Sequence, residues 1–135
     1  MFGDELILEG GTLNIDNKGR IFVPAFTKVE KNDKIILEIS RHNDETHLIL
    51  HVYQKYFNIL KRFMDLRDSA TSIEEFSKYE KSIEEICSKL QGIVIVDQNK
   101  RILIPKTIME NLGWEFNKPT QYEGLGTSLS LSQKK

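Results

Sequence analysis

The 135-residue chain has a single cysteine, Cys87, which excludes an internal disulfide framework and is typical of a protein from a reducing compartment. Long apolar runs are also missing. The run from Ile93 to Val96 is among the longest, far short of the about 20 residues that span a bilayer. The opening MFGDELILEGG carries acidic residues and no basic start, so we expect no signal peptide. These absences predict a cytoplasmic protein.

Neither charge is in clear excess, because the net charge is −1 and the pI is about 6.3, so total charge does not indicate a nucleic-acid-binding protein. The charges are unevenly placed. Residues 16–34 hold five basic and three acidic residues (+2), and residues 97–106 hold three and one (+2). Residues 71–91 hold three lysines and five glutamates (−2). A DNA-facing edge needs only local positive potential, so DNA binding stays open.

One eleven-residue pattern occurs twice, as NIDNKGRIFVP over residues 14–24 and as IVDQNKRILIP over residues 95–105. Four identical pairs lie 81 positions apart: Asp16/Asp97, Arg20/Arg101, Ile21/Ile102 and Pro24/Pro105. In each copy a polar turn separates two β-rich runs, which predicts a β-hairpin. The proline then suits the first turn of a short helix, over 25–30 in the first copy and over 106–112, with Gly113 as C-cap, in the second.

Period-two alternation after each helix predicts further strands at 47–52 and 128–132. We therefore expect one β-rich α+β domain, 1–135, made of repeat one (11–52), a helical linker (53–91) and repeat two (92–135). Each repeat is too small to bury its own apolar face, so the two should close on one another.

The linker predicts two amphipathic helices, the second with Ser72 and Glu75 at capping-box spacing. Apolar and aromatic residues recur at helical spacing in both: Tyr53, Tyr56, Phe57, Leu60, Phe63 and Met64, then Ile73, Phe76, Tyr79, Ile83, Ile86 and Leu90. We interpret both stripes as core packing. Cys87 lies beside the second stripe and is expected to be a small buried apolar residue.

The repeated motif allows two interpretations. Arginine contacts guanine or phosphate with two hydrogen bonds, and a two-stranded ribbon fits a major groove, so Arg20 and Arg101 are candidate DNA readers. Alternatively, Asp16–Arg20 and Asp97–Arg101 are salt bridges that hold the two turns. Both hold together if an arginine braced in the free protein is released to DNA. Gly19 is expected to take a left-handed turn conformation under either interpretation.

Other candidate sites are weak. His47 and His51 fall on one face of a predicted strand at roughly 13 Å from each other, too far to share a zinc ion. His42 adds no ligand set, so we expect no metal site. Phosphate-binding loops, HExxH and GxSxG are missing from the sequence, and we expect neither an enzyme nor a cofactor.

The paired Asp-x-x-x-Arg turns, each followed by β-branched residues and a proline, resemble the AbrB/SpoVT swapped-hairpin superfamily. Two copies in one chain, joined by a helical hairpin, are similar to the MraZ family. The segments TLNIDNKGRIFVPA and VDQNKRILIP look like the two motifs of that family, and QYEGLGTSLSLSQKK looks like its closing β-hairpin. The resemblance covers essentially the whole chain.

This resemblance implies a bacterial transcriptional regulator: two pseudo-repeated β-hairpin and short-helix units that form a swapped-hairpin β-barrel, with a helical hairpin between them. It implies a nucleoid-associated homo-oligomer, in ring form, that reads tandem promoter repeats in double-stranded DNA. The resemblance assigns roles residue by residue: Arg20 and Arg101 as readers, Lys18 and Lys100 as phosphate or groove contacts, and Asp16, Gly19 and Asp97 as organisers of the motif.

Lys100 stands where the family pattern has glycine, which predicts that the second turn does not reach the same positive-φ conformation. Arg20 is therefore expected to be a stronger reader than Arg101. A different class of function stays open beside DNA reading. A swapped-hairpin module such as an antitoxin, which also binds its own promoter, would use the helical region between Tyr53 and Leu90, or the C-terminal tail, to hold a protein partner.

Overall fold

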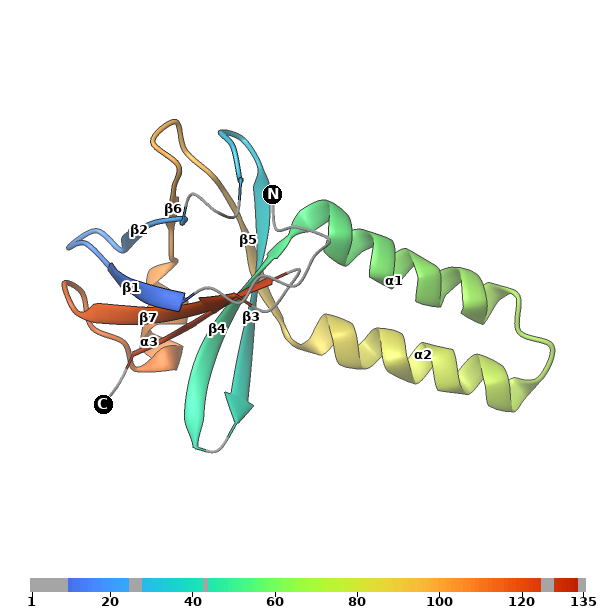
Figure 1. The fold of residues 1–135 in the computed structure, drawn as a ribbon. Helices are drawn as coiled ribbons and strands as arrows, with labels where there is room; N and C mark the ends of the chain where they lie inside the picture. The colour runs from blue at the N-terminus through green and yellow to red at the C-terminus, as the bar shows by residue number, and fades with distance from the viewer. Residues whose placement is uncertain (1–9, 25–27, 43, 125–127, 134–135) are drawn as a thin grey trace.

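The computed structural model describes residues 10–24, 28–42, 44–124 and 128–133 (Figure 1). Within these residues it is an α+β protein, as predicted. The first repeat supplies β1 (Gly10–Asn14), β2 (Arg20–Phe22), β3 (Lys34–His42) and β4 (Glu45–Val52). The helices α1 (Tyr53–Asp68) and α2 (Ile73–Ser88) follow. The second repeat supplies β5 (Leu90–Ile95), β6 (Arg101–Leu103), α3 (Lys106–Leu112), β7 (Pro119–Gly124) and β8 (Ser128–Ser132).

Several local predictions are confirmed. The helix α3 has the predicted bounds and ends at Gly113 in the left-handed region, with φ of 69°. The Ser72 hydroxyl caps α2 by accepting the backbone N–H of Glu75 at 3.1 Å. The helix expected over 25–30 is not seen at Lys28–Glu30, and residues 25–27 lie outside the described residues.

The two repeats interlock through their strands. Six strands form a sheet in the order β1-β7-β8-β4-β3-β5, and β2 pairs with β6 in a separate two-stranded ribbon. The first strand of each repeat pairs with the third strand of the other, β1 with β7 and β5 with β3. The fourth strands, β4 and β8, pair with each other. All of these pairings are antiparallel, so one pseudo-twofold arrangement relates the two repeats.

The hairpin prediction for the repeated motif is wrong, because β2 does not pair with β1 and β6 does not pair with β5. The turns themselves close as predicted, with Asp16 N–H donating to the Arg20 carbonyl at 3.0 Å and Asp97 N–H to the Arg101 carbonyl at 2.9 Å. Beyond the turn, each short strand crosses to its counterpart in the other repeat. That pairing places Ile21 opposite Ile102 and buries both.

The core is built from equivalent residues of the two repeats. Five buried pairs lie 81 positions apart: Ile15/Val96, Ile21/Ile102, Val23/Ile104, Leu48/Leu129 and Leu50/Leu131. Each pair belongs to one contiguous apolar cluster, to which α3 adds Ile108, Met109 and Leu112. Neither repeat has a second apolar face of its own to cover these side chains, so burial requires both.

The helices α1 and α2 form a hairpin that projects away from the sheets (Figure 1). The prediction that both stripes pack in the core is therefore largely wrong: the buried residues are Tyr56 on α1 and Ile83 on α2. Ile73 is 85% exposed, and Leu90 begins β5 instead of extending the α2 stripe. Cys87, expected to be buried, is exposed. The two helices cover each other on one side only. Most other members of the stripes are half-buried, and Phe57 and Phe76 are exposed.

Candidate nucleic-acid interface

The two predicted readers lie diagonally across the β2–β6 ribbon, one on each strand, although 81 residues separate them in the chain. Its register pairs Arg20 with Leu103 and Phe22 with Arg101. Because alternate residues of a strand face opposite sides, the buried pair Ile21 and Ile102 points into the core. The other four side chains point outward from the ribbon. The fold thus places both arginines on one solvent-facing surface.

Each arginine leaves a turn organised by an aspartate. Asp16 Oδ1 accepts the backbone N–H groups of Lys18 at 2.9 Å and Arg20 at 2.8 Å, and Oδ2 accepts Arg20 Nε–H at 2.7 Å. Asp97 repeats this pattern with Asn99 at 2.8 Å, Arg101 N–H at 2.9 Å and Arg101 Nε–H at 3.3 Å. Both aspartates thus hydrogen-bond within their own turns, and the salt-bridge interpretation of both pairs is confirmed.

The ion pairs with aspartate leave both arginines with further N–H donors for a second binding partner. The contact with the aspartate engages Nε, and a guanidinium has four further N–H donors on its two terminal amino groups. Both side chains remain partly exposed. Lys18 and Lys100 are exposed at the tips of the two turns and add positive charge beside the ribbon.

The hydrogen bonds also shift the aspartate pKa values. Donation from the Arg20 backbone N–H lowers the pKa of Asp16 below its ordinary value of 3.8, helped by Lys18 N–H and the Arg20 guanidinium. The Arg101 backbone N–H is the main cause of the same lowered pKa at Asp97. Both carboxylates therefore stay ionised, and both arginines stay braced, in mildly acidic solution.

The second turn corrects one prediction, because Lys100 does reach the left-handed region. Its φ is 59°, and the φ of Gly19 at the equivalent position is 87°. The same bonds hold both turns, since the Gly19 carbonyl accepts Ile104 N–H at 2.9 Å and the Lys100 carbonyl accepts Val23 N–H at 3.0 Å. These constraints force a non-glycine residue into an unfavourable backbone region. The expectation that Arg20 reads more strongly than Arg101 loses its structural basis.

Sequence reasoning missed the two apolar side chains of the ribbon. Phe22 and Leu103 are 56% and 54% exposed, and the Arg101 guanidinium lies over the Phe22 ring at 5.6 Å from its centroid. Each apolar residue follows its arginine by two positions, in RIF and in RIL. Because alternate residues of a strand face the same side, these tripeptides could have predicted that the apolar residue and its arginine share the outer face.

The histidines have separate partners. His47 Nδ1 lies 3.2 Å from the Ser130 hydroxyl, and His51 Nε2 lies 3.6 Å from Glu38 Oε2. Burial lowers the pKa of His51, and the nearby Glu38 opposes that shift. In the part of the chain that the structure describes, no three His, Cys, Asp or Glu side chains gather as a metal-ion site.

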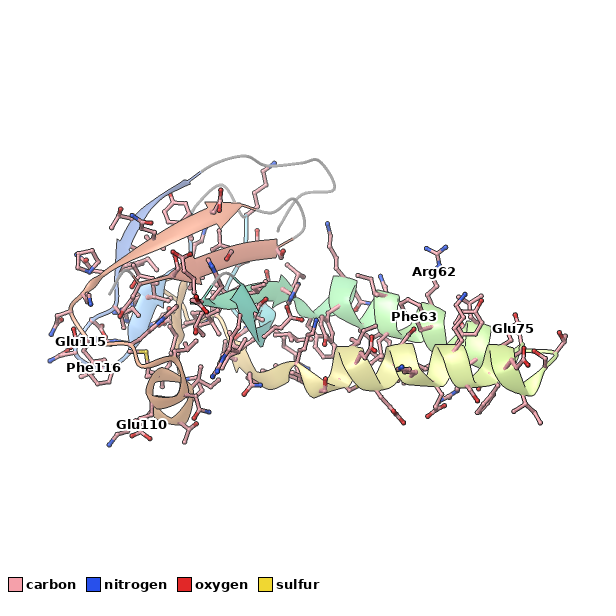
Figure 2. The ribbon with its side chains drawn as sticks, turned by 90° about the horizontal axis from the view of Figure 1, so that it is seen from below. Arg62, Phe63, Glu75, Glu110, Glu115 and Phe116 are labelled. Atoms are coloured by element: carbon pink, nitrogen blue, oxygen red, sulfur yellow. The ribbon has the colours of Figure 1, made fainter. Side chains whose placement is uncertain are left out.

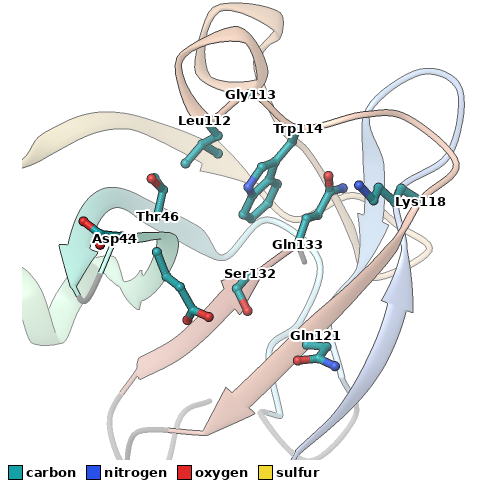
Figure 3. A pocket seen from close by; sticks show the side chains of 10 residues that line it. Asp44, Thr46, Leu112, Gly113, Trp114, Lys118, Gln121, Ser132 and Gln133 are labelled. Carbon is teal, nitrogen blue, oxygen red and sulfur yellow. The ribbon is translucent and has the colours of Figure 1, made fainter. Parts of the chain in front are cut away.

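A cleft of about 410 Å³ lies at a different place, between the β3–β4 turn, the end of α3 and the strands β7 and β8 (Figure 3). Figure 3 shows Trp114 and Gln133 at its wall. The Gln133 amide bonds both backbone groups of Glu115 at 3.0 Å, so it ties the chain after β8 to the chain after α3. No predicted DNA-binding residue lines this cleft.

Comparison with known proteins adds little to these observations. No family model matches the chain, and no curated protein matches it. Among solved structures, the solution structure of PHS018 from Pyrococcus horikoshii is similar to 96% of this chain over 97% of its own length. The TM-score is 0.43 and the sequence identity 13%, too low for any inference from that structure. Each helix of the described residues is too short or too polar to span a lipid bilayer.

Removing the glycine from the first turn and adding one to the second should have opposite effects on the free energy of unfolding. Gly19→Ala should lower the free energy of unfolding by about 1–3 kcal/mol, because it puts a side chain at positive φ. The new Cβ would also lie only 3.1 Å from the Ile104 carbonyl oxygen. Lys100→Gly should leave the stability unchanged or raise it by up to about 1 kcal/mol. Urea denaturation measures both. Equal stability of Gly19→Ala and the wild type would contradict the constraint at this turn.

The lowered aspartate pKa values predict a pH dependence. Asp16→Asn/Asp97→Asn keeps the Oδ1 acceptors and removes both charges. In the wild type, the carboxylates add stability above their ordinary pKa of 3.8, and this is lost as pH falls through their lower folded values. Thermal unfolding followed between about pH 6 and pH 2 should therefore show a steeper fall of Tm for the wild type than for the variant. Parallel Tm curves would show that the negative charges of the two aspartates contribute nothing to stability.

Proposed function

We propose that this chain is a sequence-specific DNA-binding transcriptional regulator of the MraZ type, which reads double-stranded DNA with the β2–β6 ribbon. The observation that carries the proposal is the convergence of Arg20 and Arg101 on the outer face of that ribbon. If the arginines served only to stabilise their own turns, the fold would not need to bring the two turns to one surface. Pairing the two turns through short strands brings two guanidinium groups and their flanking lysines onto one surface.

The ribbon has the properties that major-groove reading requires. A two-stranded antiparallel ribbon fits the major groove, where arginine binds guanine O6 and N7 with two hydrogen bonds. Arg20 and Arg101 are held at the turns by Asp16 and Asp97, so they are positioned before DNA binds. The exposed Phe22 and Leu103 lie beside them and suit contact with thymine methyl groups. Lys18 and Lys100 would bind the flanking phosphates.

The proposal includes the finer statement of the fold. The exchange of β2 and β6 between the repeats, together with the β1–β7 and β5–β3 pairings, supports assignment to the swapped-hairpin β-barrels. A homo-oligomer would place several ribbons along one DNA, and tandem sites would then gain avidity from contacts that are individually weak. Such a regulator acts in the cytoplasm, at the nucleoid.

The test uses a duplex pool with a randomised centre, from which the wild-type protein first enriches its preferred sequence. In a mobility shift with the enriched duplex, Arg20→Ala/Arg101→Ala should bind at least about 30-fold more weakly, because each bidentate contact contributes about 1 kcal/mol or more. Lys18→Ala and Lys100→Ala should each reduce the salt dependence of binding, by a slope of about 0.9 per lost phosphate contact.

Arg41→Ala is the matched control, because it removes one exposed arginine from β3, outside the ribbon. Its affinity for the enriched duplex should equal that of the wild type. The proposal fails if the pool yields no preferred sequence. The assignment of the readers fails if the double variant binds as tightly as the control.

A further inference from the structure

The cleft at the end of α3 lies where the two repeats differ in length. Eight positions separate Pro24 from Asn32 in the first repeat, and twelve separate Pro105 from Asn117 in the second. The two asparagines are equivalent, because both have positive φ and both donate the backbone N–H to the residue before a turn aspartate of the other repeat. The second repeat thus has four extra residues in this stretch, which contains Trp114, the single tryptophan of the chain.

The first repeat is longer at a different point, the turn between β3 and β4. Eight residues, 40–47, connect these strands beyond the last cross-strand pair that the repeats share, whereas four residues connect β7 to β8. The longer turn contains Asp44, Glu45 and Thr46. Both extra stretches, one from each repeat, line the same cleft (Figure 3). The internal symmetry of the fold therefore does not account for this cleft.

Trp114 supplies an aromatic wall of the cleft. Its side chain packs partly against the core and is half-buried, and Figure 3 shows the ring directed into the cleft, across from Asp44. The neighbouring Gln133 amide is already engaged, because it bonds both backbone groups of Glu115 and the Thr120 hydroxyl. Hydrogen bonds therefore fix the chain around the indole ring, and the ring itself is available to a ligand.

The cleft has an excess of negative charge, since its lining has two carboxylates and one lysine, a net charge of −1. Lys118 Nζ lies 3.6 Å from Glu115 Oε2, so this cation already has an anionic partner. Glu45 Oε2 lies 3.3 Å from His47 Nε2, and the Glu45 side chain is 67% exposed. Asp44 is exposed and has no ion pair or hydrogen bond among the described residues. Neither carboxylate of the β3–β4 turn has a lysine or arginine partner.

We infer that this cleft binds a small organic cation of the quaternary ammonium type, with the charged group over the Trp114 indole and facing Asp44 and Glu45. Tryptophan attracts cations more strongly than the other aromatic side chains, and proteins recognise quaternary ammonium groups through such rings. The volume of about 410 Å³ is in the range of small-molecule sites. A neutral ligand would gain nothing from the two carboxylates, and an anion would be repelled by them. The inference does not rest on DNA binding.

Tryptophan fluorescence measures the binding, because the single tryptophan of the chain lies at the cleft. Two ligands are titrated into the full chain at constant ionic strength: choline, and its neutral isostere in which a tert-butyl group replaces the trimethylammonium group. Choline should change the fluorescence saturably and bind at least about tenfold more tightly than the isostere, because only choline carries a charge. No saturable response to choline up to about 10 mM, or equal affinity for both ligands, overturns the inference.

Substitutions in the cleft test the roles of its residues, with choline binding measured by isothermal titration calorimetry. Asp44→Asn/Glu45→Gln removes both carboxylates from exposed positions and should weaken choline binding by about fivefold or more. Trp114→Leu removes the aromatic ring and should weaken it by about tenfold or more. Thermal unfolding checks that each variant is folded. The charge variant keeps the test decisive if Trp114→Leu does not fold, because its two positions are outside the core.

Glu74→Gln/Glu84→Gln is the matched control, because it removes the same two charges from exposed positions of α2. Figure 2 shows that this helix, at Glu75, lies at the opposite end of the molecule from Glu115. The control should bind choline as the wild type does. Equal weakening in the control and in the charge variant of the cleft would mean attraction by net charge alone and would overturn the site. Wild-type affinity in the charge variant of the cleft would overturn it as well.

Discussion

The structure depends on one buried contact, the pairing of Ile21 with Ile102 between β2 and β6. Each strand has only three residues, too few to be stable as part of an isolated hairpin. Pairing across the repeats buries one isoleucine from each and adds hydrogen bonds from each turn to the other repeat. The exchange thereby joins two sequence repeats in one core, and it brings the two arginine turns together on the outer face.

The two turns show how one geometry is reached with different residues. Gly19 reaches positive φ at little cost, whereas Lys100 reaches it against its intrinsic preference. The aspartate at the start of each turn accepts the same set of backbone and guanidinium donors. Because these bonds hold the turn at both ends, Lys100 can occupy a backbone conformation that costs less free energy for glycine. The surrounding hydrogen bonds, more than the glycine, set the position of the arginine.

The apolar residues that the two sheets share are buried, whereas several apolar residues of the α1–α2 hairpin are exposed. In the sheets, equivalent residues of the two repeats bury each other, as in Leu48 with Leu129 and Leu50 with Leu131. The hairpin has no such counterpart in the chain, because it occurs once, between the repeats. Several of its apolar residues, such as Ile59 and Ile73, therefore stay exposed.

The sequence by itself determined the local features: the repeat at an offset of 81, the turns at Asp16 and Asp97, the cap at Ser72 and the end of α3 at Gly113. These depend on residues within a few positions of each other. Only the tertiary structure decided that β2 pairs with β6, that Phe22 lies under the Arg101 guanidinium, and that Ile73 and Cys87 stay exposed. Periodicity identifies an apolar face but not its partner. That choice is made by the burial of residues far apart in the chain.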